Sequence, residues 1–328
     1  MTVSETRDRG FAPYSGLLRR PRAPFVTFVI IVRRAGARPS WFNIGQMSTT
    51  EVLRHRLSRK DIIIMAGCHD AMSARLIEAA GLDVGFMSGF AVSAARLGMP
   101  DTGLISYGEL VDQGRNICKA VSIPMIGDGD TGFGSAQNIK RTVQGYAGAG
   151  FACIMLEDQV APKRCGHTEG KSVVGRDEAL TRIRAACDAR DEGADILIMA
   201  RTDARVDSLD EAIARCQEFR RIGADITFLE APGTEAEMRR YCAEVGGPKM
   251  ANMIEGGRTP LIPPPQLEAI GYSIAVYPLT LLNVSIVAMR QALQQLKRGE
   301  RAGAAMEFSE LREAVGFPAY YAEEARYK

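Results

Sequence analysis

Eight short apolar runs recur along the chain, each the length of a β-strand and rich in Ile, Val, Met and Phe. The stretches between them carry apolar residues at intervals of three and four positions, which is the spacing of an amphipathic helix. Strands that alternate with helices in this way pair in parallel. The eight runs are 62–66, 83–88, 123–128, 151–157, 195–201, 225–230, 249–253 and 273–277.

The helical stretches complete a repeating unit of strand and helix. Several are followed by a glycine, which can adopt the left-handed conformation of a helix C-cap, at Gly81, Gly150, Gly193, Gly223 and Gly246. Because the runs are apolar on both faces, eight such units predict a (β/α)₈ TIM barrel rather than an open doubly wound sheet. The predicted helices are 71–80, 107–120, 135–149, 176–189, 209–222 and 235–245.

Polar residues follow most of the apolar runs. The active site of a (β/α)₈ barrel lies at the carboxyl ends of its strands. Any one of these residues alone would be read as an ordinary loop residue, but seven strand ends in register predict a shared site. The residues are Ser88, Asp128, Asp130, Glu157, Arg201, Asp203, Glu230, Asn252, Glu255 and Pro278.

Composition excludes several classes of partner. The chain has 41 basic against 39 acidic residues, so no global basic field favours nucleic acid. Its seven cysteines include no Cys-x-x-Cys pair, a pattern typical of a reducing compartment, and we expect a cytoplasmic protein. The apolar run at 25–32 is too short to span a bilayer, so no membrane partner is expected.

The first 46 residues differ from the rest, with eight Arg against one Glu and one Asp. An Arg-rich segment that is poor in acids is compatible with a targeting peptide. The favoured interpretation is a disordered or wrongly assigned leader, with translation starting at Met47. Residues 47–328 are then expected to form one catalytic barrel domain that includes the C-terminal helices.

The segment from Gly127 to Gly134 carries Asp128 and Asp130 between glycines. It matches the dinucleotide fingerprint G-x-G-x-x-G, but its carboxylates would lie against a pyrophosphate and it occurs in the third unit rather than the first. On a regular strand, residues at i and i+2 share a face, so both carboxylates could reach one ion. The segment predicts a hard cation, Mg²⁺ with Mn²⁺ as a substitute.

The loop after the fourth run reads Lys163-Arg164-Cys165-Gly166-His167. Two cations and a histidine around one thiol predict an electropositive site that favours the thiolate of Cys165 and attracts anions. A role for His167 in proton handling is also expected.

Beyond the eighth run, a long apolar helix at 279–296 is followed by a second at 306–315 and an aromatic tail at Tyr320 and Tyr321. So much apolar surface outside the barrel predicts packing on another subunit.

At these motifs the chain resembles the isocitrate lyase/PEP mutase superfamily. Within it, the chain is similar to the short lyases that act on 2-methylisocitrate and 2,3-dimethylmalate, and to the petal death protein branch. The similarity runs from about Met47 nearly to the C-terminus, and its most specific part is the 163–167 loop. The other matching segments are 86–90, 98–101, 154–159, 199–203, 251–257 and 277–279.

The resemblance implies a Mg²⁺-dependent carbon–carbon lyase that cleaves a 2-hydroxy dicarboxylate or tricarboxylate to pyruvate and a carboxylic acid. Metal binding is then expected at Asp128, Asp130, Asp101 and Glu157. Cys165 would donate a proton, while Arg201, Lys163 and His167 would stabilise the developing charge. Contacts with the substrate are expected from Ser88, Gly89, Phe90, Arg164, Gly166, Glu230, Asn252, Pro278 and Leu279. Relatives exchange the last helix between subunits, which implies a homotetramer built as a dimer of helix-swapped dimers.

Departures from the family bear on the substrate. Thr168 stands where isocitrate lyases proper carry a longer side chain, and Pro278 resembles the lyases rather than the oxaloacetate hydrolases. The segment from Met253 to Gly257 favours a small alkylmalate over a tricarboxylate. Other functions stay open at this point: a phosphonate mutase of the carboxyphosphonoenolpyruvate or PEP type, an oxaloacetate decarboxylase or hydrolase, an NAD-dependent dehydrogenase, and a non-catalytic keto-acid sensor.

Overall fold

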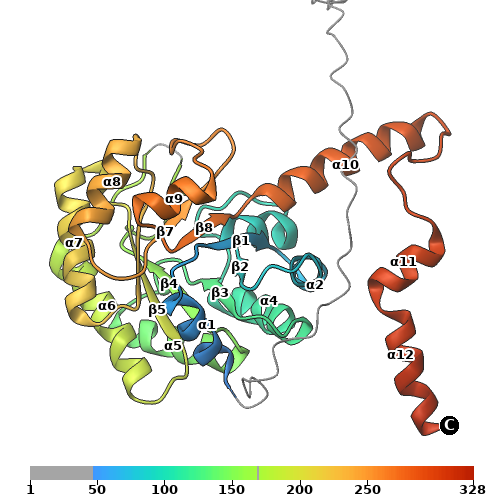
Figure 1. The fold of residues 1–328 in the computed structure, drawn as a ribbon, viewed down its shortest axis with the longest axis horizontal. Helices are drawn as coiled ribbons and strands as arrows, with labels where there is room; N and C mark the ends of the chain where they lie inside the picture. Colours follow the sequence, from blue (N-terminus) through green and yellow to red (C-terminus); the bar gives the residue numbers. More distant parts are fainter. Residues whose placement is uncertain (1–46, 168–169) are drawn as a thin grey trace, which may run out of the picture. The chain divides into compact units, whose positions relative to one another are not determined.

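The computed structural model describes residues 47–167 and 170–328. The expectations for the leader at 1–46 and for Thr168 lie outside these residues. Eight parallel strands form one sheet in the order β6-β5-β4-β3-β2-β1-β8-β7, with helices packed around it (Figure 1). The strands are β1 Ile63–Cys68, β2 Gly85–Met87, β3 Met125–Asp128, β4 Cys153–Glu157, β5 Leu197–Thr202, β6 Ile226–Leu229, β7 Met250–Asn252 and β8 Ile274–Tyr277.

The two end strands of this order, β6 and β7, meet through one parallel bridge between Thr227 and Lys249. The Thr227 N–H also donates to the Pro248 carbonyl at 3.1 Å. The sheet is therefore nearly closed on itself, and the predicted (β/α)₈ barrel is confirmed.

The helices predicted between the strands are present, with ends that differ by at most two residues. Sequence patterns missed α1, α3, the π-helix η2 at Ser93–Leu97, α9 and α12. The helices are α1 Thr49–Ser58, α2 Ala71–Ala79, α3 Gly89–Val92, α4 Tyr107–Ala120, α5 Ala136–Ala149, α6 Arg176–Asp191, α7 Leu209–Ile222, α8 Glu235–Glu244, α9 Pro264–Ile270, α10 Thr280–Lys297, α11 Phe308–Val315 and α12 Phe317–Glu324.

One predicted glycine cap was wrong. After α8 the left-handed residue is Gly247, with φ of 80°, rather than Gly246. The reason is that Val245 already has an extended conformation, so the chain turns toward β7 one residue later than expected.

Alternation along the strands divides the core into two layers. One set of apolar side chains fills the barrel interior, and Leu53 of α1 joins this cluster at the amino ends of the strands. The other set packs against the surrounding helices. Interior residues that matter below are Phe86, Ile126, Met155, Met199, Phe228, Met250 and Val276.

The last three helices expose many apolar side chains. Leu293 and Leu296 of α10 are 63% and 60% exposed, and Phe308 of α11 is 72% exposed. Among the described helices, none has the length and apolar character needed to cross a membrane.

Candidate active site

The polar residues at the carboxyl rim lie on the same strand faces as the residues that fill the barrel interior. A side chain two positions after an interior residue points to the same side of the strand. In β4 and β5, for example, Met155 is followed by Glu157 and Met199 by Arg201. The same step leads from the other interior residues to Ser88, Asp128, Glu230, Asn252 and Pro278.

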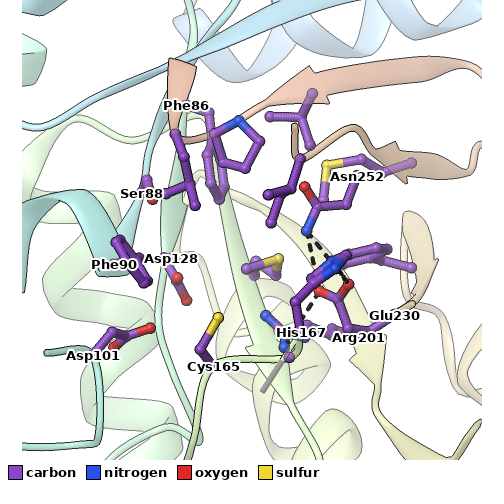
Figure 2. A pocket seen from close by; sticks show the side chains of 18 of the residues that line it. Phe86, Ser88, Phe90, Asp101, Asp128, Cys165, His167, Arg201, Glu230 and Asn252 are labelled. Carbon is purple, nitrogen blue, oxygen red and sulfur yellow. Dashed lines mark hydrogen bonds and ion pairs between the residues drawn. The ribbon is translucent and has the colours of Figure 1, made fainter. Parts of the chain in front are cut away.

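Apart from Glu157, these side chains line one cavity with about 480 Å³ of empty space. Figure 2 shows its floor and walls, which come from strands on all sides of the barrel and from the loop after β4. The residues that were expected at the site but do not line the cavity are Gly89, Arg164, Asp130, Glu157, Asp203 and Glu255. Those that do are Ser88, Phe90, Asp101, Asp128, Lys163, Cys165, Gly166, His167, Arg201, Glu230, Asn252, Pro278 and Leu279.

Asp128, at the end of β3, is held by backbone groups. Its Oδ2 accepts a hydrogen bond from the Gly89 N–H at 3.1 Å, and its Oδ1 accepts one from the Asp130 N–H at 3.1 Å. A Cβ on Gly89 would lie 2.6 Å from Asp128 Oδ2, so only glycine allows this approach. The Gly89 amide therefore orients Asp128, and the expected contact of Gly89 with the substrate stays a prediction.

Two side chains of α5, Tyr146 and Thr142, hold the backbone of the segment that begins at Asp128. The Tyr146 hydroxyl donates to the Asp128 carbonyl at 2.6 Å, and four residues earlier on α5 Thr142 donates to the Gly132 carbonyl at 3.1 Å. Sequence patterns missed this role, because both residues fall on the buried face of a predicted helix and read as core.

Asp130 departs from the predicted geometry. Strand β3 ends at Asp128, and Asp130 has φ of 48°, so the two carboxylates do not share a strand face. Instead, Lys163 Nζ contacts Asp130 Oδ1 at 2.8 Å and Asp101 Oδ1 at 2.6 Å. Burial raises the pKa of Asp130 to about 6, against the effect of Lys163 and with that of Asp128. Lys163 therefore serves as a counter-ion to the carboxylates.

Glu157 is a buried carboxylate whose negative charge has few partners among the described residues. Both of its oxygens are buried, and within the described residues neither accepts a hydrogen bond, although Arg201 Nη1 lies 3.2 Å from Oε2. Burial raises the pKa of Glu157 well above its ordinary value. A nearby cation would stabilise the charged form of such a buried carboxylate and lower its pKa again.

The acidic side of the cavity fits Mg²⁺ by its chemistry. Asp101 and Asp128 line the cavity with hard oxygen ligands, and Asp130 and Glu157, which do not line it, offer further carboxylates at the ends of β3 and β4. In the described part of the chain, no group of three or more His, Cys, Asp or Glu side chains is arranged to hold a metal by itself. Mg²⁺ commonly keeps several waters and uses one or two carboxylates, so such a complete cage is not required.

The opposite side of the cavity centres on Arg201 and Glu230 (Figure 2). Arg201 Nη2 lies 3.4 Å from Glu230 Oε2, and Asn252 Nδ2 donates to the same oxygen at 3.2 Å. Burial opposes ionisation of Glu230, but Arg201 and a hydrogen bond from His167 outweigh it and hold the pKa of Glu230 at about 2. Arg201 and Glu230 are thus both charged at neutral pH.

His167 has a polar contact at each of its ring nitrogens. Its Nδ1 accepts a hydrogen bond from the Arg258 N–H at 3.0 Å. Nε2 lies 2.8 Å from Glu230 Oε1. In this arrangement His167 orients Glu230, and its expected roles in charge stabilisation and proton handling stay predictions.

Cys165 projects into the cavity between these two sides. Figure 2 shows its sulfur between Asp101 and Asp128 on one hand and His167 and Arg201 on the other. Burial raises the pKa of the Cys165 thiol, and the nearby backbone N–H and Arg201 do not offset it. The predicted preference for thiolate was wrong, because Lys163 is neutralised by carboxylates and Arg164 is exposed.

Arg164 is fixed through its backbone. Its N–H donates to Gln159 Oε1 at 2.9 Å, and Gln159 Nε2 donates to the Arg164 carbonyl at 2.8 Å. Because the side chain is exposed and outside the cavity lining, its expected contact with substrate stays a prediction.

Comparison with known proteins gives consistent matches. Residues 53–297 match the phosphoenolpyruvate phosphomutase family. A 2,3-dimethylmalate lyase from Eubacterium barkeri is 43% identical over 275 residues, covering 82% of this chain and 95% of that protein. A chloroplastic carboxyvinyl-carboxyphosphonate phosphorylmutase from Arabidopsis thaliana is 40% identical over 283 residues, covering 83% of each chain.

Solved structures match at the level of the whole barrel. A crystal structure of 2,3-dimethylmalate lyase, described as a PEP mutase/isocitrate lyase superfamily member, superposes with a TM-score of 0.82 at 33% identity. The superposition covers 85% of this chain and 95% of that one.

Proposed function

Because this chain belongs to the phosphoenolpyruvate phosphomutase family and is a carbon–carbon lyase of its superfamily, we propose that it cleaves an alkylmalate with a methyl group at C2 to pyruvate and a carboxylic acid with the help of Mg²⁺. The observation that carries the proposal is the position of Cys165. A protonated thiol stands between a group of carboxylates suited to a cation and an arginine suited to an anion. That is the arrangement required to protonate a carbanion as it forms.

The reaction starts from the 2-hydroxyl group of the substrate, whose carboxylate and hydroxyl lie against the Asp101 and Asp128 side. Mg²⁺ held by Asp101 and Asp128 would supply a Lewis acid that lowers the pKa of the hydroxyl. Loss of the hydroxyl proton breaks the C2–C3 bond, releases pyruvate and leaves the second half as an enediolate dianion. Arg201 stabilises this dianion, and the Cys165 thiol protonates its carbon. The hydroxyl proton passes to solvent, and the Cys165 thiolate takes a proton from solvent afterwards, so the cleavage consumes and releases no net proton.

Charge and lining favour a dicarboxylate. Among the described residues that line the cavity, Lys163 and Arg201 are the permanent cations, and Lys163 is already paired with Asp101 and Asp130. A third substrate carboxylate would therefore need a counter-ion that this lining does not provide. Apolar side chains suited to an alkyl group form much of the remaining wall, namely Phe86, Phe90, Ile254, Val276, Pro278 and Leu279.

The decisive assay is pyruvate release from a panel of alkylmalates with a methyl group at C2 and different groups at C3, together with 2-methylisocitrate and oxaloacetate, with Mg²⁺. We expect turnover of an alkylmalate, and expect the Cys165→Ala variant to lose it. Pyruvate from oxaloacetate alone, unaffected by the variant, would indicate a decarboxylase instead, whereas oxalate and acetate from oxaloacetate would indicate a hydrolase. Turnover of a phosphonate, with none of the malates, would place the chain with the relative that is named as a phosphorylmutase.

Replacement of Asp128 tests the cation. Asp128→Ala is expected to abolish both Mg²⁺ binding and pyruvate release, because it removes a charged ligand at the rim. Calorimetric titration with Mg²⁺, in parallel with the activity assay, measures both. Asp128→Asn is the matched variant, since its amide oxygen still accepts from Gly89 while the charge is lost. Wild-type Mg²⁺ affinity in both variants would exclude Asp128 as a ligand.

The exposed apolar side chains of α10 to α12 support a homotetramer of helix-swapped dimers. Light scattering is expected to give the mass of four chains, and Leu293→Glu on α10 is expected to give a smaller species. Gln294→Glu, on the same helix and also exposed, is the control. A monomer for the wild-type protein would refute the assembly. The expected cytoplasmic location stays a prediction.

A further inference from the structure

Lys171 is a buried cation that the proposed reaction does not use. Its side chain is 4% exposed. Nζ donates to the Gly166 carbonyl at 2.7 Å and to Asp203 Oδ1 at 2.8 Å. Gly166 belongs to the segment that carries Cys165, whereas Asp203 follows the end of β5. One ammonium group therefore joins the Cys165 segment to the barrel.

Asp203 is a firm anchor for this contact. Its Oδ2 accepts from Arg201 Nε at 2.8 Å, and its own N–H donates to Asp158 Oδ1 at 2.8 Å. Burial opposes ionisation of Asp203, but Arg201 and Lys171 outweigh it and lower the pKa of this carboxyl. Asp203 thus carries a negative charge that the two cations share, so the position of one depends on the other.

The Cys165 segment also packs closely on the Arg201 side of the cavity. A Cβ added to Gly166 would lie 2.5 Å from Arg201 Nη2 and 2.6 Å from Glu230 Cγ. Gly166 is therefore in direct backbone contact with both charged groups, and Lys171 holds its carbonyl in that place. A shift of Gly166 would move the adjacent Cys165 relative to Arg201.

We propose that Lys171 is a positioning residue, which sets the distance between the Cys165 thiol and Arg201 by tying the Gly166 carbonyl to Asp203. This role rests on the proposed function of Cys165 as proton donor. It acts through geometry rather than through contact with substrate, since Lys171 does not line the cavity. A misplacement of about 1 Å at a reacting group can cost a factor of about 10² in rate.

The test is Lys171→Met, which keeps the length of the side chain and removes the ammonium. Two readouts are measured: kcat and KM for pyruvate release, and the rate at which iodoacetamide alkylates Cys165, followed by peptide mass. We expect kcat to fall by about 10²-fold with a smaller change in KM. The alkylation rate is expected to change as well, and Lys171→Arg is expected to restore part of kcat.

Lys249→Met is the matched control. Lys249 is also buried, at 5% exposure, and its Nζ donates to the Gly247 carbonyl at 2.7 Å, but it precedes β7 at the opposite end of the barrel. The Lys249→Met variant should have a lower melting temperature, with kcat and the rate of Cys165 alkylation unchanged. Equal loss of kcat in both methionine variants would reduce Lys171 to a stabilising residue.

Wild-type kcat and alkylation in Lys171→Met would overturn the proposal outright. If that variant does not fold, Lys171→Arg decides by the same two readouts, since it keeps the charge but changes the distance between the Gly166 carbonyl and Asp203. Wild-type values there would also overturn it. Alkylation needs no substrate, so an altered alkylation rate in a protein that releases no pyruvate from any malate would refute the proposed function and retain the positioning role.

Discussion

Cys165→Ala is expected to lower kcat for pyruvate release by about 10²-fold or more, the scale of losing a general acid. The thiol is the group that projects between the two charged sides of the cavity, and alanine cannot protonate a carbanion. Mg²⁺ affinity should be unchanged, because no carboxylate is altered. Cys242→Ala, a cysteine on α8 outside the cavity lining, is the control and should keep full activity.

The pH dependence of kcat/KM provides a second measurement of the same role. The protonated thiol is the active form, so the rate should fall as pH rises through its pKa. Because burial raises that pKa above its ordinary value of 9.0, the fall is expected above pH 9.0. A rate that instead rises with pH, in step with formation of a thiolate, would contradict a proton donor.

Arg201→Met is expected to combine a large loss of activity with a large loss of stability. Three buried carboxylates, on Glu157, Asp203 and Glu230, lie within ion-pair distance of this guanidinium. Breaking a buried ion pair by removing one partner costs about 3–5 kcal/mol of unfolding free energy. Loss of a preorganised donor to a developing anion costs about 10²–10³-fold in kcat. Urea denaturation and the pyruvate assay measure the two effects.

Arg190→Met is the control that separates the loss of activity from the loss of stability. Arg190 pairs with Asp225 at 2.9 Å and donates to the Gly223 carbonyl, outside the cavity lining. This variant should lose stability and keep kcat. Equal retention of kcat in the Arg201 variant would argue against its catalytic role.

The stability penalty of Arg201→Met also depends on pH. In the wild-type protein the pKa of Glu230 falls from 4.5 to about 2, so its ion pair contributes stability above pH 4.5. That contribution is lost as pH falls toward about 2. The difference in unfolding free energy between wild type and variant should therefore be largest at neutral pH and shrink below pH 4.5.

The barrel and much of its rim could be predicted from local patterns. Strand alternation is a property of the backbone, so an interior Met199 or Phe228 implies that Arg201 or Glu230 points to the same side two residues later. Helix periodicity and glycine caps placed most helix ends in the same way. The exceptions were short or atypical elements, such as α3 with its adjoining π-helix, where too few residues carry a periodic signal.

The charge compensation and the pKa values of the site residues depend on contacts between distant parts of the chain, which no local pattern reveals. Lys163 and Arg164 suggested a positive loop, yet Lys163 is neutralised by Asp101, which lies 62 residues earlier in the chain. Burial then raises rather than lowers the pKa of Cys165. The residues that support the site, Tyr146 and Lys171, likewise read as an ordinary core tyrosine and a loop lysine until their partners were known.

By itself, the sequence determined the alternation of strands and helices and which residue types reach the carboxyl rim, because these follow from local geometry. Only the tertiary structure decided which side of each strand faces the barrel axis, which of the rim residues meet, and which charges are already compensated. Burial and ion pairing depend on residues far apart in the chain, and they set the protonation on which the chemistry rests.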